Sequence, residues 1–300
     1  MKSERSKLYR AAGLALLATF SYTVMNLCIK LTKHDANQAI IGVVRFLIGW
    51  FYINGVILFK HSKSLTSALT DNYTTSHWWP YLARAAFTVL SVSCAYYALQ
   101  HIPVTNAMAL MMTQALFIPL LERIVYRRKL SFAVVLAILI GFVGVAISLN
   151  LSLDRSMLSV GALAALVSGM SIAITYLSLR YLTHFDSPQR ILTIHLSLVL
   201  VLFSVYLIFN WQLPTLPSTW FWLGMLSVAG TFYQEFITRA MQLGPAKLVS
   251  TLQYFSIIFG AILGWLVWHE KPVLTTCIGS VLIILGSVLT IVYSASDRKR

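Results

Sequence analysis

The side chains of this sequence that could do chemistry are single ionisable groups inside long apolar segments. Arg45, Arg84, His195 and Glu235 each stand several residues from the nearest predicted helix end. A charged group in hydrocarbon is costly, and it usually pairs with another group or faces a water-filled cavity. These four residues therefore mark either structural pairs inside a helical bundle or the path of a polar solute.

The two arginines lie at different depths. Arg45 stands about 12 Å inside its segment at 1.5 Å per residue, too deep to reach the interface easily. Two interpretations are open: a cavity cation that holds an anionic group or couples two parts of the protein, and a structural pair with backbone carbonyls or Glu235. Arg84 is nearer a segment end, where a long side chain can reach the interface. A structural role is therefore favoured for Arg84.

Glu235 and Arg239 are four residues apart, a spacing that places opposite charges on one helix face. They could neutralise each other. Glu235 is also the one acid far from every predicted helix end, and a carboxylate in a low dielectric can take up a proton. A permanent ion pair and a site for a proton or a cationic substrate both remain open. His195 is expected to be a hydrogen-bonded packing residue.

Amides and tyrosines accompany these charges inside the apolar segments. Buried amides need hydrogen-bond partners, either on a neighbouring helix or in a wet cavity. With the aromatic residues of the same segments they predict a substrate cavity. The candidate substrate-binding residues are Asn26, Arg45, Gln114, Tyr176, Tyr233, Gln234, Glu235, Gln253 and Tyr254.

Motifs of enzymes are scarce in the sequence. It has no phosphate-binding loop of the form Gly-x-x-x-x-Gly-Lys-Ser/Thr, and His269-Glu270 lacks the second histidine of a zinc protease motif. A membrane-embedded enzyme needs a pair of carboxylates or an acid-base dyad, and Glu235 and His195 fall on separate helices. We therefore predict no catalytic residue, no metal site and no cofactor, and we expect a protein that is not an enzyme.

The elements that must position these residues are membrane-spanning helices. The chain has 300 residues, of which 58% are hydrophobic and 11% charged, so a soluble globular protein is excluded. Apolar runs of about 20 residues match the thickness of a bilayer. Ten helices are predicted near residues 11–31, 38–59, 78–99, 103–124, 130–150, 157–179, 190–209, 220–241, 245–268 and 273–293.

The charge distribution predicts the orientation of these helices. Most of the 23 lysines and arginines fall on segments on the side of the N-terminus, whereas Lys30, Lys33, Arg155 and Lys271 fall on the opposite side. Because cytoplasmic loops are enriched in Lys and Arg, both termini are predicted to be cytoplasmic. The formal net charge of +14 thus reflects topology, and no nucleic-acid partner is expected.

The two halves of the chain, 1–150 and 151–300, read as a duplication. Ala98-Leu99-Gln100 recurs as Ala240-Met241-Gln242, and Pro103 recurs as Pro245 at the same distance. Five helices in each half are an odd number, so the second half enters the membrane inverted relative to the first. The predicted fold is therefore an all-α polytopic membrane protein with two inverted five-helix repeats.

Particular residues resemble a known family. The segment Tyr97–Ala107, which reads YALQHIPVTNA, and the segment Ala240–Ala246, which reads AMQLGPA, resemble the two repeats of the drug/metabolite transporter superfamily, EamA type. Arg45 is similar to the arginine of that family's second helix. Arg128 stands where the first repeat of the family usually has Glu, which argues against a mechanism with paired acids at both membrane faces. Further matching positions are Pro119, Tyr254, Gly264, Glu270 and Gly279.

This resemblance implies a secondary transporter that exports or exchanges small metabolites, amino acids or drugs by alternating access, with its cavity near the midplane. Uptake of a bulky aromatic or nucleoside-like metabolite is the alternative, because the stretch 254–272 is similar to branches that move riboflavin or S-adenosylmethionine. Two alternatives from other functional classes remain: a membrane-embedded enzyme and a partner subunit that does not itself transport. The expected location is the bacterial inner membrane, the expected partners are a small-molecule substrate and the lipid bilayer, and proton or ion coupling is left open.

Overall fold

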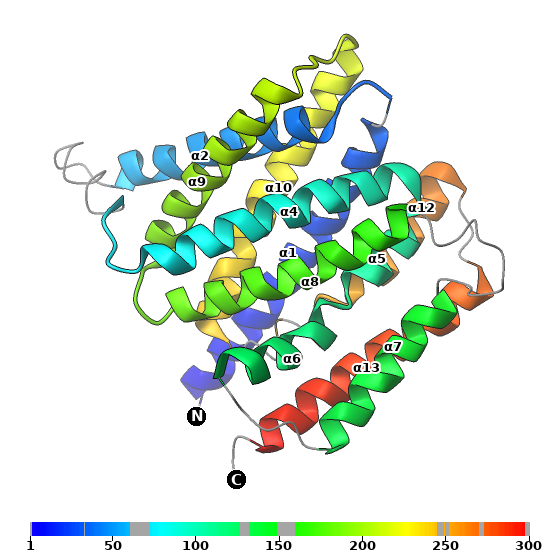
Figure 1. Ribbon diagram of the computed structural model, residues 1–300. Helices are drawn as coiled ribbons and strands as arrows, with labels where there is room; N and C mark the ends of the chain where they lie inside the picture. The colour runs from blue at the N-terminus through cyan, green and yellow to red at the C-terminus, as the bar shows by residue number, and fades with distance from the viewer. Residues whose placement is uncertain are drawn as a thin grey trace.

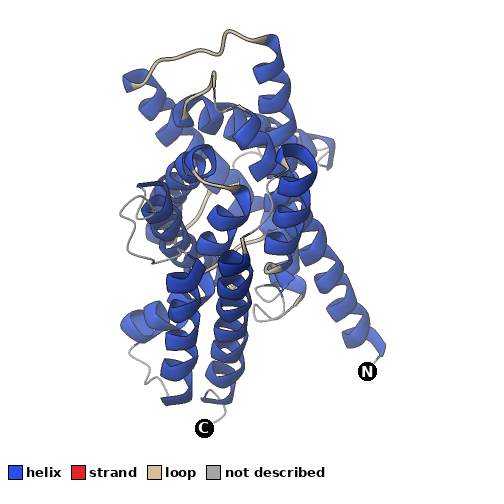
Figure 2. Cartoon of the chain, turned by 90° about the vertical axis from the view of Figure 1, so that its right-hand side faces the viewer, coloured by secondary structure: helices blue, strands red, loops and turns tan. Residues whose placement is uncertain are grey.

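The computed structural model describes residues 2–32, 34–60, 73–126, 132–148, 160–244, 249, 252–269 and 273–297. Over these ranges the chain forms helices and connecting loops without strands (Figures 1 and 2). The helices of the first half are α1 (Lys2–Leu31), α2 (Gln38–Lys60), α4 (Trp78–His101), α5 (Val104–Met111), α6 (Gln114–Tyr126) and α7 (Phe132–Ser148). Those of the second half are α8 (Val160–Leu182), α9 (Pro188–Phe209), α10 (Pro217–Leu243), α12 (Phe255–Trp268) and α13 (Leu274–Asp297).

The helices suit a lipid environment. Five of them, α1, α2, α4, α8 and α9, are long and apolar enough to cross a bilayer, and α7 and α12 are shorter apolar helices. Large apolar side chains such as Phe51, Phe59 and Leu266 are exposed on the outside of the bundle. Such surfaces are stable in contact with lipid and not with water. The prediction of an all-α polytopic membrane protein is confirmed.

Helices of one half pack mainly on helices of the other half. In Figure 1, α1 runs along α10 and α4 runs along α8. In each pair the first membrane span of one half packs against the third span of the other half, so the two pairs are equivalent. The same holds for α2 against α9, α5 against α12 and α7 against α13, where each helix meets its counterpart. The two halves therefore interlock, and the space between them is enclosed by helices of both. The boundary predicted at residues 150 and 151 lies outside the described residues.

Two of the expected helices are interrupted. The predicted helix near 103–124 is divided between α5 and α6 by a turn at Met112 and Thr113, where the Thr113 hydroxyl donates to the Leu110 carbonyl at 2.6 Å. In the second half a turn at Gln253 and Tyr254 precedes α12. Backbone that leaves the helical path at membrane depth is tolerated only where protein or a cavity satisfies it. The backbone groups freed at the two interruptions must therefore be satisfied by surrounding protein or by a cavity.

Glycines allow close contact between α7 and α13. A Cβ atom on Gly144 of α7 would come within 2.7 Å of the Ile283 backbone nitrogen on α13, and one on Gly286 would come within 2.5 Å of the Gly141 nitrogen. Backbones approach this closely only where side chains are absent. These glycines are therefore packing residues of the contact between α7 and α13.

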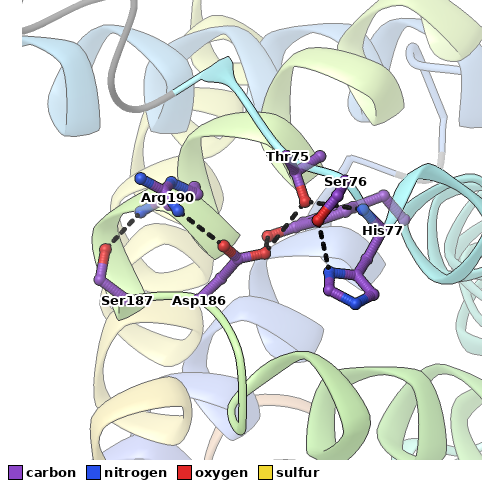
Figure 3. Close-up of polar contacts among 7 residues, drawn as sticks. Thr75, Ser76, His77, Asp186, Ser187 and Arg190 are labelled. Carbon is purple, nitrogen blue, oxygen red and sulfur yellow. Dashed lines mark hydrogen bonds and ion pairs between the residues drawn. The ribbon is translucent and has the colours of Figure 1, made fainter.

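One loop of each half is held by an aspartate. Asp186, which follows α8, accepts hydrogen bonds from the Tyr81 hydroxyl at 2.9 Å and from Thr75 Oγ1 at 3.2 Å, and it pairs with Arg190 at 2.8 Å (Figure 3). Ser187 caps the first turn of α9 in the same cluster. The Asp186 carboxylate thus ties the entry of α4 to the entry of α9.

Asp35 follows α1 as Asp186 follows α8. Its carboxylate accepts hydrogen bonds from the backbone N–H groups of Thr215 at 3.0 Å and Leu216 at 2.9 Å, just before α10. These donors from Leu216 and Thr215 stabilise the ionised form and lower the pKa of Asp35 to about 2. Asp35 and Asp186, which follow the first helix of each half, therefore each bind the segment at the start of a helix of the other half.

Candidate functional site

The described helices enclose a cavity between the two halves of the chain. Its volume is about 60 Å³, and its walls come from α1, α2 and α4 of the first half and from α8 and α10 of the second. The apolar part of the wall includes Met25, Val92 and Ile172. The polar side chains that line it are Tyr22, Asn26, Arg45, Arg84, Thr88, Ser91, Tyr96, Thr175, Tyr176, Tyr233 and Gln234.

A second, smaller cavity of about 10 Å³ lies beside the interrupted helices. It is lined by Met112 and Gln114 at the first interruption and by Gln253 at the second. Tyr22 and Tyr233 line both cavities, and their rings lie 5.0 Å apart. The irregular backbone of both halves therefore faces the enclosed space, as in transporters whose binding sites are formed by discontinuous helices.

A chain of side-chain hydrogen bonds joins the interruptions to the cavity wall. Gln114 Nε2 donates to Gln253 Oε1 at 3.0 Å, and Gln253 Nε2 donates to the Tyr176 hydroxyl at 2.6 Å. The Tyr176 and Tyr233 hydroxyls are 2.8 Å apart. Four residues predicted from the sequence are thus brought together by hydrogen bonds between their own side chains inside the membrane, and Gln114 Oε1 is left without a partner among the described residues.

Arg45 lies on the cavity wall, 4% exposed. Its Nη1 donates to the Tyr96 hydroxyl at 2.9 Å, and its guanidinium lies over the Phe46 ring at 4.8 Å. Gly230 of α10 gives it room, because a Cβ atom there would lie 2.7 Å from Arg45 Nε. Among the described residues, Arg45 contacts neither of the partners considered from the sequence, Glu235 and a backbone carbonyl. Arg45 is held by a phenol and an aromatic face.

The expectation that Arg84 reaches the membrane interface is wrong. Arg84 is 1% exposed and lines the same cavity as Arg45. The reason is that α8 packs along α4 and covers this face of the helix. Arg84 Nε and Nη1 have no hydrogen-bond partner among the described residues.

Glu235 and Tyr254 are placed away from the cavity wall. Glu235 is 7% exposed and forms an ion pair with Arg239, one of the two interpretations left open above. Tyr254 is buried beside α12. Neither belongs to the described residues that line the two cavities. A role for them in substrate binding stays a prediction.

His195 is buried on α9, yet both ring nitrogens lack a hydrogen-bond partner among the described residues. The expected hydrogen-bonded packing role is therefore not what the structure shows. Among the same residues, no group of three His, Cys, Asp or Glu side chains could hold a metal ion.

The sequence analysis does not identify several polar residues of the cavity, among them Thr175 of α8 and three residues of α4. Thr88, Ser91 and Tyr96 line it from α4 together with Arg84. Arg84, Thr88 and Ser91 are spaced by four and three residues, which places them on one helix face. That polar stripe inside an apolar helix was the signal that could have identified this wall.

Comparison with known proteins adds the family. The model of the EamA-like transporter family matches residues 10–150 and residues 159–292. The chain belongs to the EamA-like transporter family. The resemblance to the drug/metabolite transporter superfamily is thereby confirmed, and the protein is a multi-pass membrane protein of a transporter family.

Individual relatives are more distant. The pseudopaline exporter of Pseudomonas aeruginosa is 28% identical over 287 residues, which cover 92% of this chain and 93% of the exporter. Riboflavin transporters of Brucella anthropi and Vibrio cholerae are 29% and 27% identical, covering 80% and 77% of this chain and 84% and 76% of the transporters. A solved crystal structure with 16% identity and a TM-score of 0.64 covers 96% of this chain and 98% of that chain, and it shows the same fold.

Proposed function

We propose that the protein is a secondary active transporter that exports or exchanges a small organic metabolite across the bacterial inner membrane by alternating access. The observation that carries this proposal is the cavity between the two halves, whose wall holds polar side chains of both and is joined to the two helix interruptions by the hydrogen bonds from Gln114 to Gln253 and from Gln253 to Tyr176. A site shared by two repeats can open to either side when one repeat moves against the other. Export is favoured by the exporter relative of matching length.

The proposal includes the sequence-based topology. The two halves, 1–150 and 151–300, are inverted repeats, and both termini are cytoplasmic. The substrate leaves chemically unchanged, so the protein is not an enzyme. The cavity is smaller than the several hundred Å³ of common ligand sites. Substrate entry therefore requires the helices around it to move apart.

A flux experiment tests this proposal. Purified protein is reconstituted into vesicles loaded with a defined mixture of amino acids, nucleosides and aromatic acids, and the external medium is analysed by mass spectrometry. At least one compound should leave with unchanged mass, faster than from vesicles that contain Gln253→Leu. A compound of altered mass made by the purified protein alone would place it among enzymes. Equal leakage from both preparations would contradict transport through this cavity.

Uptake of a bulky aromatic metabolite is the second candidate. It is favoured by the relatives named as riboflavin transporters and by Tyr22 and Tyr233, whose rings meet at 5.0 Å on the cavity wall. Vesicles with one orientation of the protein separate the two candidates. Export predicts faster movement from the cytoplasmic side outward, whereas uptake predicts faster inward movement of riboflavin.

A further inference from the structure

The cavity carries an unbalanced positive charge. Arg45 and Arg84 both line it, and none of the described residues around it is acidic. Glu235, the acid on α10, pairs with Arg239 instead. Two cations that share a space of low dielectric repel each other and lose their hydration, so such an arrangement persists where it serves a purpose. A negative charge inside the cavity would stabilise both arginines.

The unpaired polar atoms of the cavity point to the same chemistry. Four side-chain atoms of residues that line the cavity are buried without a hydrogen-bond partner among the described residues: Arg84 Nε, Arg84 Nη1, Asn26 Nδ2 and Thr88 Oγ1. The three nitrogen atoms are donors that cannot accept a hydrogen bond, and the Thr88 hydroxyl can also donate one. A group that supplies several acceptor lone pairs and a negative charge would satisfy them together. The fork of N–H groups on a guanidinium matches the two oxygens of a carboxylate.

We infer that Arg45 and Arg84 bind the acidic group of an organic anion, a carboxylate or a comparable oxyanion, which is the substrate of the proposed transporter. The volume of about 60 Å³ accepts a few water molecules or one small acidic group. The body of the anion then contacts Met25, Tyr22 and Tyr233, which continue the wall toward the helix interruptions. This inference rests on the proposed function and specifies its substrate class.

Binding of such an anion would connect the two halves of the protein. The arginines come from α2 and α4 in the first half, whereas Tyr176 and Tyr233 come from α8 and α10 in the second. An anion held by the arginines with its body against the tyrosines is in contact with both repeats. Its binding energy can then favour one arrangement of the repeats over the other.

Paired ligands test the inference on the wild-type protein. Thermal unfolding of the purified protein is measured with indole-3-acetate, phenylacetate and N-acetylphenylalanine, and with the neutral amide of each. A ligand that binds the native state raises the apparent melting temperature. The carboxylates should bind at least about tenfold more tightly than the corresponding amides, because the amides lack the negative charge. Equal stabilisation by acids and amides, or no stabilisation by any acid, overturns the inference.

Variants assign the effect to the two arginines. Arg45→Gln and Arg84→Gln should each abolish the preference for carboxylates, and Arg84→Lys should retain part of it because it keeps the charge but not the fork. Arg10→Gln, on an exposed part of α1, is the control and should behave as the wild type. A preference that survives in both glutamine variants overturns the inference. If a glutamine variant does not fold, the inference is tested by comparing acids with amides on the wild-type protein and on Arg84→Lys.

The flux assay separates this inference from the proposed function. Transport of neutral compounds alone, with unchanged mass, would support a transporter and overturn the anion site. Transport of the carboxylates and not of their amides supports both. Chemical conversion of any compound by the purified protein contradicts the proposed function, whatever the charge of that compound.

Discussion

At the scale of single residues, the position of Arg45 depends on a glycine of the opposite half. A methyl group at Gly230 would lie 2.7 Å from Arg45 Nε and 3.1 Å from Met25 Sδ, both on flexible side chains that can move. Gly230→Ala should therefore fold but displace Arg45, and it should weaken carboxylate binding about tenfold. Gly224→Ala on the same helix has nothing within 4 Å and is the matched control. Titration by thermal shift compares them, and equal binding by both variants would contradict this role of Gly230.

The pair of Glu235 and Arg239 should respond unequally to its two neutral variants. The Arg239 side chain is 47% exposed and Glu235 only 9%. Glu235→Gln leaves a cation that can reach polar surroundings, so the loss should be small, about 1 kcal/mol. Arg239→Gln leaves a buried carboxylate without its partner and should cost more, up to about 3–5 kcal/mol. Thermal stability and pH-dependent flux are measured on the same preparations. A Glu235→Gln protein of normal stability that has lost the pH dependence of flux would instead indicate proton uptake.

The sequence predicted the polar residues of the site better than their partners. Arg45, Gln114 and Gln253 were identified because an isolated polar group in an apolar segment needs compensation. The partner of each buried polar group depends on the rotation of the packed helices relative to each other. A single sequence holds no direct signal for this rotation. For the same reason Tyr96 was missed and Arg84 was assigned to the interface.

At the scale of elements, the interruption between α5 and α6 is the feature that hydropathy could not show. The segment reads as one apolar run, so a continuous helix was predicted. The turn is stabilised by tertiary contacts, since Gly169 of α8 lies against the carbonyl groups of Met111 and Leu110. A single local signal was present in Thr113, whose hydroxyl can bond a carbonyl of its own helix.

Gly169 should therefore be intolerant of substitution. A Cβ atom there would lie 2.9 Å from the Met111 carbonyl oxygen, and backbone cannot move aside as a side chain can. Gly169→Ala should lower stability by about 1–3 kcal/mol. Gly55→Ala, with nothing within 4 Å, serves as the control in the same unfolding assay. A Gly169→Ala protein as stable as the control would show that the close contact has little energetic weight.

The Asp35 loop should give stability with a defined pH dependence. The backbone donors at Thr215 and Leu216 lower the pKa of Asp35 in the folded protein to about 2, below the ordinary value near 3.9. Its contribution is therefore present above about pH 4 and is lost as the pH falls toward 2. The difference in melting temperature between the wild type and Asp35→Asn should be seen at neutral pH and shrink over that interval. A difference independent of pH would contradict the role of the charge.

At the scale of the whole molecule, the fold was more predictable than the site. The membrane-spanning segments and the duplication of the two halves follow from apolar runs and from recurring residues such as Pro103 and Pro245. The interlocking of the halves does not follow from them. It depends on glycine contacts such as Gly144 with Ile283, which become visible only when the helices are assembled.

The inverted orientation of the repeats predicts opposite exposure of two equivalent loops. His34 follows α1 and His184 follows α8, and both are exposed in the structure. In a background with Cys28, Cys94 and Cys277 replaced by Ser, His34→Cys should react with an impermeant thiol reagent added to intact cells. His184→Cys should react only after the membrane is opened. Reaction of both from the same side would contradict inverted repeats.

The proposed transport mechanism depends on one cavity that serves as the transport site. The most direct measurement is the flux of a transported carboxylate into or out of matched vesicles containing the wild type, Arg84→Gln, Gly230→Ala or the control Gly224→Ala. The wild type and Gly224→Ala should transport it at similar rates, and the other two should transport it at least about tenfold more slowly. Wild-type rates in folded Arg84→Gln and Gly230→Ala would place the transport path elsewhere and contradict the account.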